Sequence, residues 1–129
     1  DYLILNETET EEIFGINIDD KVYIGKIFHK KKEHNIRNII LTLGEKGSVL
    51  FDKDDNIKKY DAYEVNAVDT TAAGDSFIGA FALKICETDN PDLAIKYATA
   101  VAAIVVTKQG AQDSIPTVEE IEEFIKLNS

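Results

Sequence analysis

The sequence predicts an α/β domain built on a sheet with parallel strands. Two short apolar runs, 2–5 and 38–43, have the composition of strands buried on both faces of such a sheet. The segment between them, 19–35, has the apolar spacing of an amphipathic helix. A chain of 129 residues is enough for one domain with a real core.

Composition and charge exclude several classes of function. The chain is 44% hydrophobic and 29% charged, as in ordinary globular proteins. Its formal net charge of −10 argues against nucleic acid as a partner, because phosphate backbones need a basic footprint. The single cysteine, Cys86, excludes an internal disulfide and is consistent with a reducing cytosol; we expect it to fill the core.

We expect no membrane segment and a cytoplasmic location. The longest apolar run, 100–106, is far shorter than the roughly 20 residues needed to cross a bilayer, and no signal peptide is recognisable. The chain begins directly on a strand-like run and without Met, which we interpret as a piece of a longer protein.

Two interpretations remain open for the segment after the first strand. Residues 11–14 are predicted to be helical, and the helix ends at Gly15. Asn6 and Glu9 have the spacing of a capping box, which explains both residues structurally. A helix that starts at the end of a sheet strand is also a place where phosphate and its metal bind.

The helix predicted over 19–35 ends in a basic tail. Its inward residues are expected to be Val22, Ile24, Ile27 and Phe28. We interpret Lys30–Lys32 as a solvated helix end rather than a phosphate patch. His29 and His34 are five residues apart, off one helical face, so no metal site is expected there.

A strand, a glycine turn and a hairpin follow. The second buried strand is closed by the turn 44–47, and strands 48–51 and 57–60 flank the polar turn 52–56. Taken alone, the segment 42–47 is simply a turn.

The segment Asp69–Asp75 is the strongest candidate for a functional site. Its small residues precede a helix predicted over 75–87, and they leave the first backbone N–H groups of that helix open to an anion. Asp75 would repel phosphate, which makes sense if it takes a proton from a hydroxyl that attacks a phosphoryl group. The alternative is an ordinary helix cap. Phe77, Phe81 and Ile85 are the predicted buried stripe of this helix.

Two more helices are predicted near the C-terminus. Asn90-Pro91-Asp92 is a strong helix start, and that helix should run to about residue 108 and end at Gly110. Its buried face is expected to hold Ala94, Ala98, Val101 and Val105. A capping box at Thr117 opens the last helix, with Val118, Ile121, Phe124 and Ile125 inward.

Three motifs in order resemble the ribokinase-like (pfkB) carbohydrate kinases. They are Asn-x-x-Glu at Asn6–Glu9, Thr-Leu-Gly-x-x-Gly at Thr42–Gly47 and Asp-Thr-Thr-Ala-Ala-Gly-Asp at Asp69–Asp75. The resemblance covers essentially all of 1–129. It implies a three-layer α/β/α sandwich of which 1–129 is the C-terminal part, with the sugar-binding half and the lid absent.

The resemblance assigns a role to each matching residue. Asp75 would be the catalytic base, and the anion hole would be formed by the amides of Ala72, Ala73 and Gly74. The nucleotide would be bordered by Asn6, Glu9, Thr42, Leu43, Gly44, Glu45, Lys46, Gly47 and Thr99, with Glu9 acting indirectly on Mg²⁺. Potassium would be held, mostly through backbone oxygens, by Asp69, Thr71, Val105, Lys108, Gly110 and Ser114. Thr99 departs from the Asn that is common in ribokinases.

The implied activity is transfer of the γ-phosphoryl group of ATP to a sugar hydroxymethyl, with Mg²⁺ and K⁺ as cofactors. Ribose is favoured by Ala72-Ala73, the Asn-Glu-Thr-Glu run and the cation loop. The alternatives are another kinase of the family, fructokinase-like or adenosine kinase-like, and a non-catalytic nucleotide-binding module. We expect 1–129 alone to be inactive and the complete protein to be a homodimer through its lid.

Overall fold

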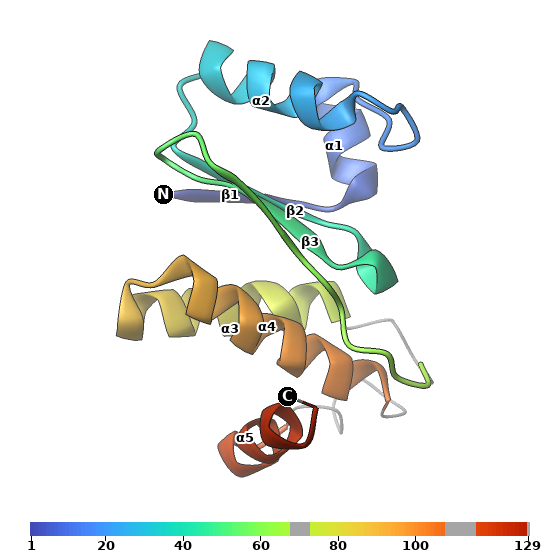
Figure 1. Cartoon of the computed structure of the whole chain (residues 1–129), viewed down its shortest axis with the longest axis vertical. Helices are drawn as coiled ribbons and strands as arrows, with labels where there is room; N and C mark the ends of the chain where they lie inside the picture. The colour runs from blue at the N-terminus through green and yellow to red at the C-terminus, as the bar shows by residue number, and fades with distance from the viewer. Residues whose placement is uncertain (68–72, 108–115, 129) are drawn as a thin grey trace. The chain divides into compact units, whose positions relative to one another are not determined.

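The computed structural model describes residues 1–67, 73–107 and 116–128, and the chain divides into two compact units, 1–61 and 62–129 (Figure 1). The first unit contains β1 (Tyr2–Leu5), α1 (Glu7–Phe14), α2 (Tyr23–Glu33), β2 (Asn38–Thr42), the 3₁₀ turn η1 (Gly44–Lys46), β3 (Ser48–Phe51) and β4 (Ile57–Tyr60). The second contains α3 (Ala73–Thr88), α4 (Pro91–Val106) and α5 (Val118–Leu127).

The first unit is built on a four-stranded sheet in the order β1-β2-β3-β4. β1 and β2 are parallel, as predicted, and the later strands pair antiparallel in two hairpins. β2 and β3 are buried along almost their whole length. The prediction of a fully buried strand is wrong for β1, whose Tyr2, Leu3 and Ile4 remain partly exposed. β1 is the outermost strand of the described sheet and has a neighbouring strand on one side only.

Helices α1 and α2 lie together on one side of this sheet (Figure 1). Side chains of a strand point alternately to its two faces. The residues that face the two helices form an apolar cluster of Ile16, Ile27, Ile39, Leu41, Leu43, Val49 and Phe51. Phe14, Ile24 and Phe28 pack against this cluster from the helices, which agrees with the inward face predicted for the second helix.

The helix predicted from residue 19 begins later, at Tyr23. Asp20 holds a turn ahead of it: its Oδ1 accepts from Val22 N at 3.0 Å, and its backbone oxygen accepts from Tyr23 N at 3.1 Å. Short polar side chains compete with helix in this way. Val22 therefore precedes the helix and is 59% exposed, so its predicted inward position is wrong.

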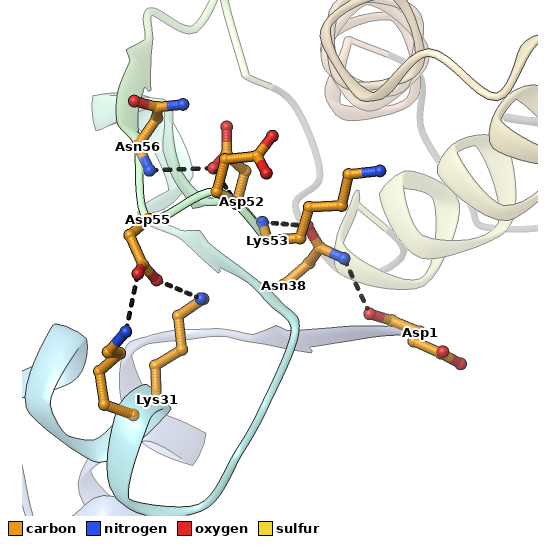
Figure 2. A network of polar contacts seen from close by, with 9 residues as sticks. Asp1, Lys31, Asn38, Asp52, Lys53, Asp55 and Asn56 are labelled. Atoms are coloured by element: carbon orange, nitrogen blue, oxygen red, sulfur yellow. Dashed lines mark hydrogen bonds and ion pairs between the residues drawn. The ribbon is translucent and has the colours of Figure 1, made fainter.

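The prediction of a fully solvated basic tail is wrong for Lys31, whose side chain is only 3% exposed. Its Nζ lies 3.2 Å from Oδ1 of Asp55, while Lys32 Nζ lies 2.7 Å from Oδ2 of the same carboxylate (Figure 2). Asp55 belongs to the turn between β3 and β4 and has φ 64°. The end of α2 is thus fastened to a hairpin that lies more than twenty residues further along the chain.

In the second unit, α3 packs against α4 and α4 against α5. Phe77 and Phe81 of α3 are buried, as is the predicted face of α4. Ile121 of α5 joins an apolar cluster with α4, and Tyr63 meets Phe124 edge to face, with ring centroids 4.9 Å apart. The remaining members of that cluster are Ala100, Val101, Ile104 and Val105.

The helix starts of this unit follow their sequence signals. The side chain of Asn90 accepts from Leu93 N, and Thr117 forms the predicted capping box with Glu120. α4 ends at Val106, earlier than predicted, and its expected stop at Gly110 lies outside the described residues.

Besides Val22, two more predicted core residues are exposed. Cys86 is on the surface. The buried residues of α3, Phe77 and Phe81, are four residues apart, and Cys86 follows Phe81 by five residues, so it lies off that face of the helix. Val118 is the first residue of α5, and the buried stretch of that helix begins only at Ile121. None of the helices in the described ranges is long and apolar enough to cross a membrane.

Candidate functional site

The start of α3 places the first backbone N–H groups of a helix beside a carboxylate. The helix begins at Ala73, two residues earlier than predicted, so Ala73, Gly74 and Asp75 form its first turn. N–H groups in the first turn have no acceptor within the helix, and the helix dipole adds positive potential there. Gly74 and Asp75 are both exposed. The arrangement provides what an anion needs, in open contact with solvent.

Gly74 is not required by packing. A Cβ atom built at this position would meet no heavy atom within 4 Å. The described structure therefore gives no internal reason for glycine here.

Asp75 is the third residue of α3, a position at which an acidic side chain stabilises a helix through the dipole. The exposed carboxylate can act on the helix dipole, or it can serve as a base. The local geometry of α3 is compatible with both.

Asn6 and Glu9 form the capping box that their spacing predicts. Glu9 N donates to Asn6 Oδ1 at 2.7 Å, and Asn6 N donates to Glu9 Oε1 at 3.0 Å. The hydroxyl of Thr10, which is buried, donates to Asn6 O at 2.8 Å. The structural interpretation of these residues is confirmed. It uses one oxygen of each capping side chain and leaves both residues exposed.

The glycine turn after β2 has a backbone that only glycine adopts readily. Gly44 has φ 58° and Gly47 has φ 94°, and Leu43 N donates to Gly47 O at 2.8 Å to close the turn. Gly44, Glu45 and Lys46 are exposed, whereas the side chain of Leu43 belongs to the core. A ligand at this turn would therefore meet the Leu43 backbone rather than its side chain.

Asn6 and the glycine turn lie at one edge of the sheet. The parallel pairing of Leu5 with Leu41 brings the carboxyl ends of β1 and β2 together. Thr42 Oγ1 donates to Leu5 O at 3.4 Å across these ends. In open α/β sheets, ligands bind outside the carboxyl ends of the strands. The first two sequence motifs thus meet at the edge where a ligand is expected.

The residues predicted to hold a cation are mostly outside the described ranges. Val105 is buried on α4, and Thr99 on the same helix is half-buried, with its hydroxyl donating to Ile95 O at 2.7 Å. The predicted residues that lie outside the described ranges are Asp69, Thr71, Ala72, Lys108, Gly110 and Ser114. Over residues 1–67, 73–107 and 116–128, no three His, Cys, Asp or Glu side chains gather as a metal site would require.

One residue of interest was missed by the sequence reasoning. Ser48 opens β3 directly after the glycine turn and is 4% exposed, and its Oγ has no hydrogen-bond partner among the described residues. A serine at the start of an otherwise apolar strand, next to a glycine turn, is the signal that could have identified it.

Comparison with known proteins shows the family. Residues 1–118 match the pfkB family of carbohydrate kinases. The chain is 40% identical over 129 residues to the ribokinase of Haemophilus influenzae and 38% identical over 128 residues to the deoxyribokinase of Salmonella typhi. These matches cover 98% and 99% of this chain, but 41% and 42% of those proteins. The chain belongs to the pfkB family of carbohydrate kinases, and it spans about two fifths of the length of these relatives.

Solved structures show the same relation. Thermotoga maritima ribokinase is 43% identical with a TM-score of 0.84, over 98% of this chain and 42% of that one. Arabidopsis thaliana ribokinase in complex with ribose and ATP is 29% identical with a TM-score of 0.89, over 98% of this chain and 41% of that one. The predicted ribokinase-like α/β fold is confirmed.

Proposed function

We propose that 1–129 is the C-terminal part of an ATP-dependent sugar kinase that phosphorylates the hydroxymethyl group of a pentose, ribose first. The observation that supports this best is the start of α3, where Asp75 stands exposed in the same helical turn as the amides of Ala73 and Gly74. Family membership and the ribose and ATP bound to the Arabidopsis relative favour this activity.

In the proposed reaction, the Asp75 carboxylate accepts the proton of the sugar hydroxyl. At the same time, the oxygen of that hydroxyl bonds to the γ-phosphorus of ATP. The bond from that phosphorus to the β–γ bridging oxygen breaks, and ADP leaves. The amides of residues 72–75 donate to the oxygens of the transferring group and offset its charge. They also offset the repulsion that the Asp75 carboxylate exerts on phosphate.

The nucleotide is proposed to bind at the edge of the sheet formed by Asn6 and the segment Thr42–Gly47, with Thr99 near the base. The glycine turn allows close backbone approach, since Gly44 and Gly47 carry no side chain. Mg²⁺, which offsets phosphate charge when bound, keeps several of its waters in proteins. One carboxylate oxygen of Glu9, Oε1, already accepts a hydrogen bond in the capping box. The other oxygen could accept from a water bound to Mg²⁺.

A potassium ion held by backbone oxygens is proposed to shape the anion hole. Its ligands would be Asp69, Thr71, Val105, Lys108, Gly110 and Ser114. We further propose a cytoplasmic homodimer whose contacts lie outside 1–129.

A non-catalytic nucleotide-binding module is the second candidate. One observation favours it: the Asn6–Glu9 capping box is satisfied within the fold, so these residues would be retained without any catalysis.

The experiment is a coupled kinase assay on the complete protein with ribose, 2-deoxyribose, fructose and adenosine, together with calorimetry of ATP·Mg²⁺ with and without potassium. We expect phosphorylation of ribose, and tighter ATP binding in potassium. ATP binding without turnover on any of the four would support the module and contradict the kinase. The isolated chain 1–129 should not turn over a sugar.

A further inference from the structure

Ser48 has a buried hydroxyl for which the fold provides no partner. The residue is 4% exposed, and no described group accepts from or donates to its Oγ. Buried polar side chains almost always have a hydrogen-bond partner, and an exception in a native fold calls for an explanation such as a bound group. Ser48 plays no part in the mechanism above.

The strand register places Ser48 directly opposite Thr42. The two residues pair across β2 and β3, next to the bond from Leu43 N to Gly47 O. They therefore form a non-hydrogen-bonded pair, the kind in which facing side chains approach most closely. Val49 points toward α1 and α2, so Ser48 and Thr42 both point to the other face of the sheet.

The two hydroxyls differ in whether their proton is already used in a hydrogen bond. Thr42 donates its proton to Leu5 O, so it faces its neighbours as an acceptor. The Ser48 hydroxyl donates to none of the described groups. Ser48 is thus a free donor at the edge of the sheet where β1 and β2 end and the glycine turn begins.

We propose that Ser48 is a further nucleotide-binding residue, whose Oγ–H donates to a phosphate oxygen of the nucleotide beside Thr42. The inference rests on the proposed function, because it needs a nucleotide at this edge. A phosphate oxygen is an acceptor that suits this place, since the exposed glycine turn next to Ser48 would let a ligand approach the backbone and the Ser48 hydroxyl would supply a donor.

The test compares Ser48→Ala with the wild-type complete protein by calorimetry with ATP·Mg²⁺, ADP and adenosine, and by urea unfolding without nucleotide. The hydroxyl makes no bond in the free protein, so its removal should not lower the unfolding midpoint. Affinity for ATP and ADP should fall about tenfold, the effect of one hydrogen bond to a charged group. Affinity for adenosine and the KM for sugar should be unchanged.

Val49→Ala is the matched control. Its side chain lies next along β3 but in the apolar cluster on the other face, so it should lower the unfolding midpoint and leave ATP affinity unchanged. An ATP affinity of Ser48→Ala within twofold of wild type would overturn the inference, as would an equal loss for adenosine or a lowered midpoint in the free protein. If the wild-type protein itself bound no ATP, the proposed function would fail instead.

Discussion

The edge of the sheet in the first unit and the start of α3 in the second unit use polar residues in different ways. At the sheet edge, Asn6 and Glu9 close a capping box, and Thr42 joins β2 to β1. At the start of α3, Gly74 and Asp75 are exposed, and packing does not require glycine at 74. Residues of the first kind contribute to folding whether or not a ligand binds. Gly74 has no packing role in the described structure, and Asp75 can contribute to the fold through the helix dipole, so the catalytic role that we propose for the start of α3 has to be tested by substitution.

Gly74→Ala should separate activity from stability most strongly. The added methyl enters open space, and Ala is the better helix former by about 1 kcal/mol, so the free energy of unfolding should rise by up to that amount. We expect the same methyl, in the first turn of α3, to crowd a phosphoryl group bound at the proposed anion hole, so turnover should fall by roughly 10²-fold, as for the loss of a transition-state donor. Urea unfolding and the coupled kinase assay measure the two effects.

Gly79→Ala is the control for this substitution. Gly79 lies further along α3, is exposed and also has nothing within 4 Å of a built Cβ. It should stabilise the helix equally and leave turnover unchanged. Equal activity of the two variants would contradict the role given to the start of α3.

Asn6→Ala should lower both stability and nucleotide affinity. Loss of the cap costs about 1 kcal/mol of unfolding free energy. Thr117→Ala removes the cap of an equivalent box on α5 and should cost about the same, but with no change in ATP affinity. If Asn6→Ala also left ATP affinity unchanged in calorimetry, Asn6 would be only a capping residue.

The smallest effect is expected from acid. Hydrogen bonds from Lys32 and then Lys31 lower the pKa of the Asp55 carboxyl below its usual value. A depressed pKa contributes stability that is complete above the unfolded pKa of about 3.9 and is lost as the pH falls through the folded pKa. Asp55→Asn should therefore remove part of the loss of stability seen below about pH 4.

Asp54→Asn is the control for the acid effect. Asp54 is the preceding residue of the same turn, is exposed and forms no salt bridge with Lys31 or Lys32, which both pair with Asp55. Urea unfolding at a series of pH values compares the variants. If the free energy of unfolding fell equally with decreasing pH in both variants, the contacts of Asp55 with the two lysines would add nothing to stability.

The sequence predicted features that depend on local hydrogen bonds or on strand pairing between near neighbours. The caps at Asn6, Asn90 and Thr117 depend on residues close in sequence, and in the structure each predicted residue caps its helix. The positive φ of Gly44 and Gly47 follows from the turn they close.

Errors arose where distant parts of the chain decide exposure. Lys31 is buried because α2 ends against the β3–β4 turn, which no helical pattern reveals. The orphaned hydroxyl of Ser48 depends likewise on strand register and burial together. For Asp75 and the amides beside it, the residues alone left a helix cap and a catalytic base as alternatives, and only the resemblance favoured the base, since a carboxylate in the first turn of a helix looks the same whether it caps or catalyses.

The central claim is that Asp75 serves chemistry rather than folding. The most direct measurement is the turnover of Asp75→Asn in the complete protein, alongside Asp92→Asn, which neutralises the acidic residue in the first turn of α4. We predict that Asp75→Asn lowers turnover by roughly 10²–10⁴-fold with ATP affinity little changed, while Asp92→Asn stays near wild type. Full activity of Asp75→Asn would contradict the account.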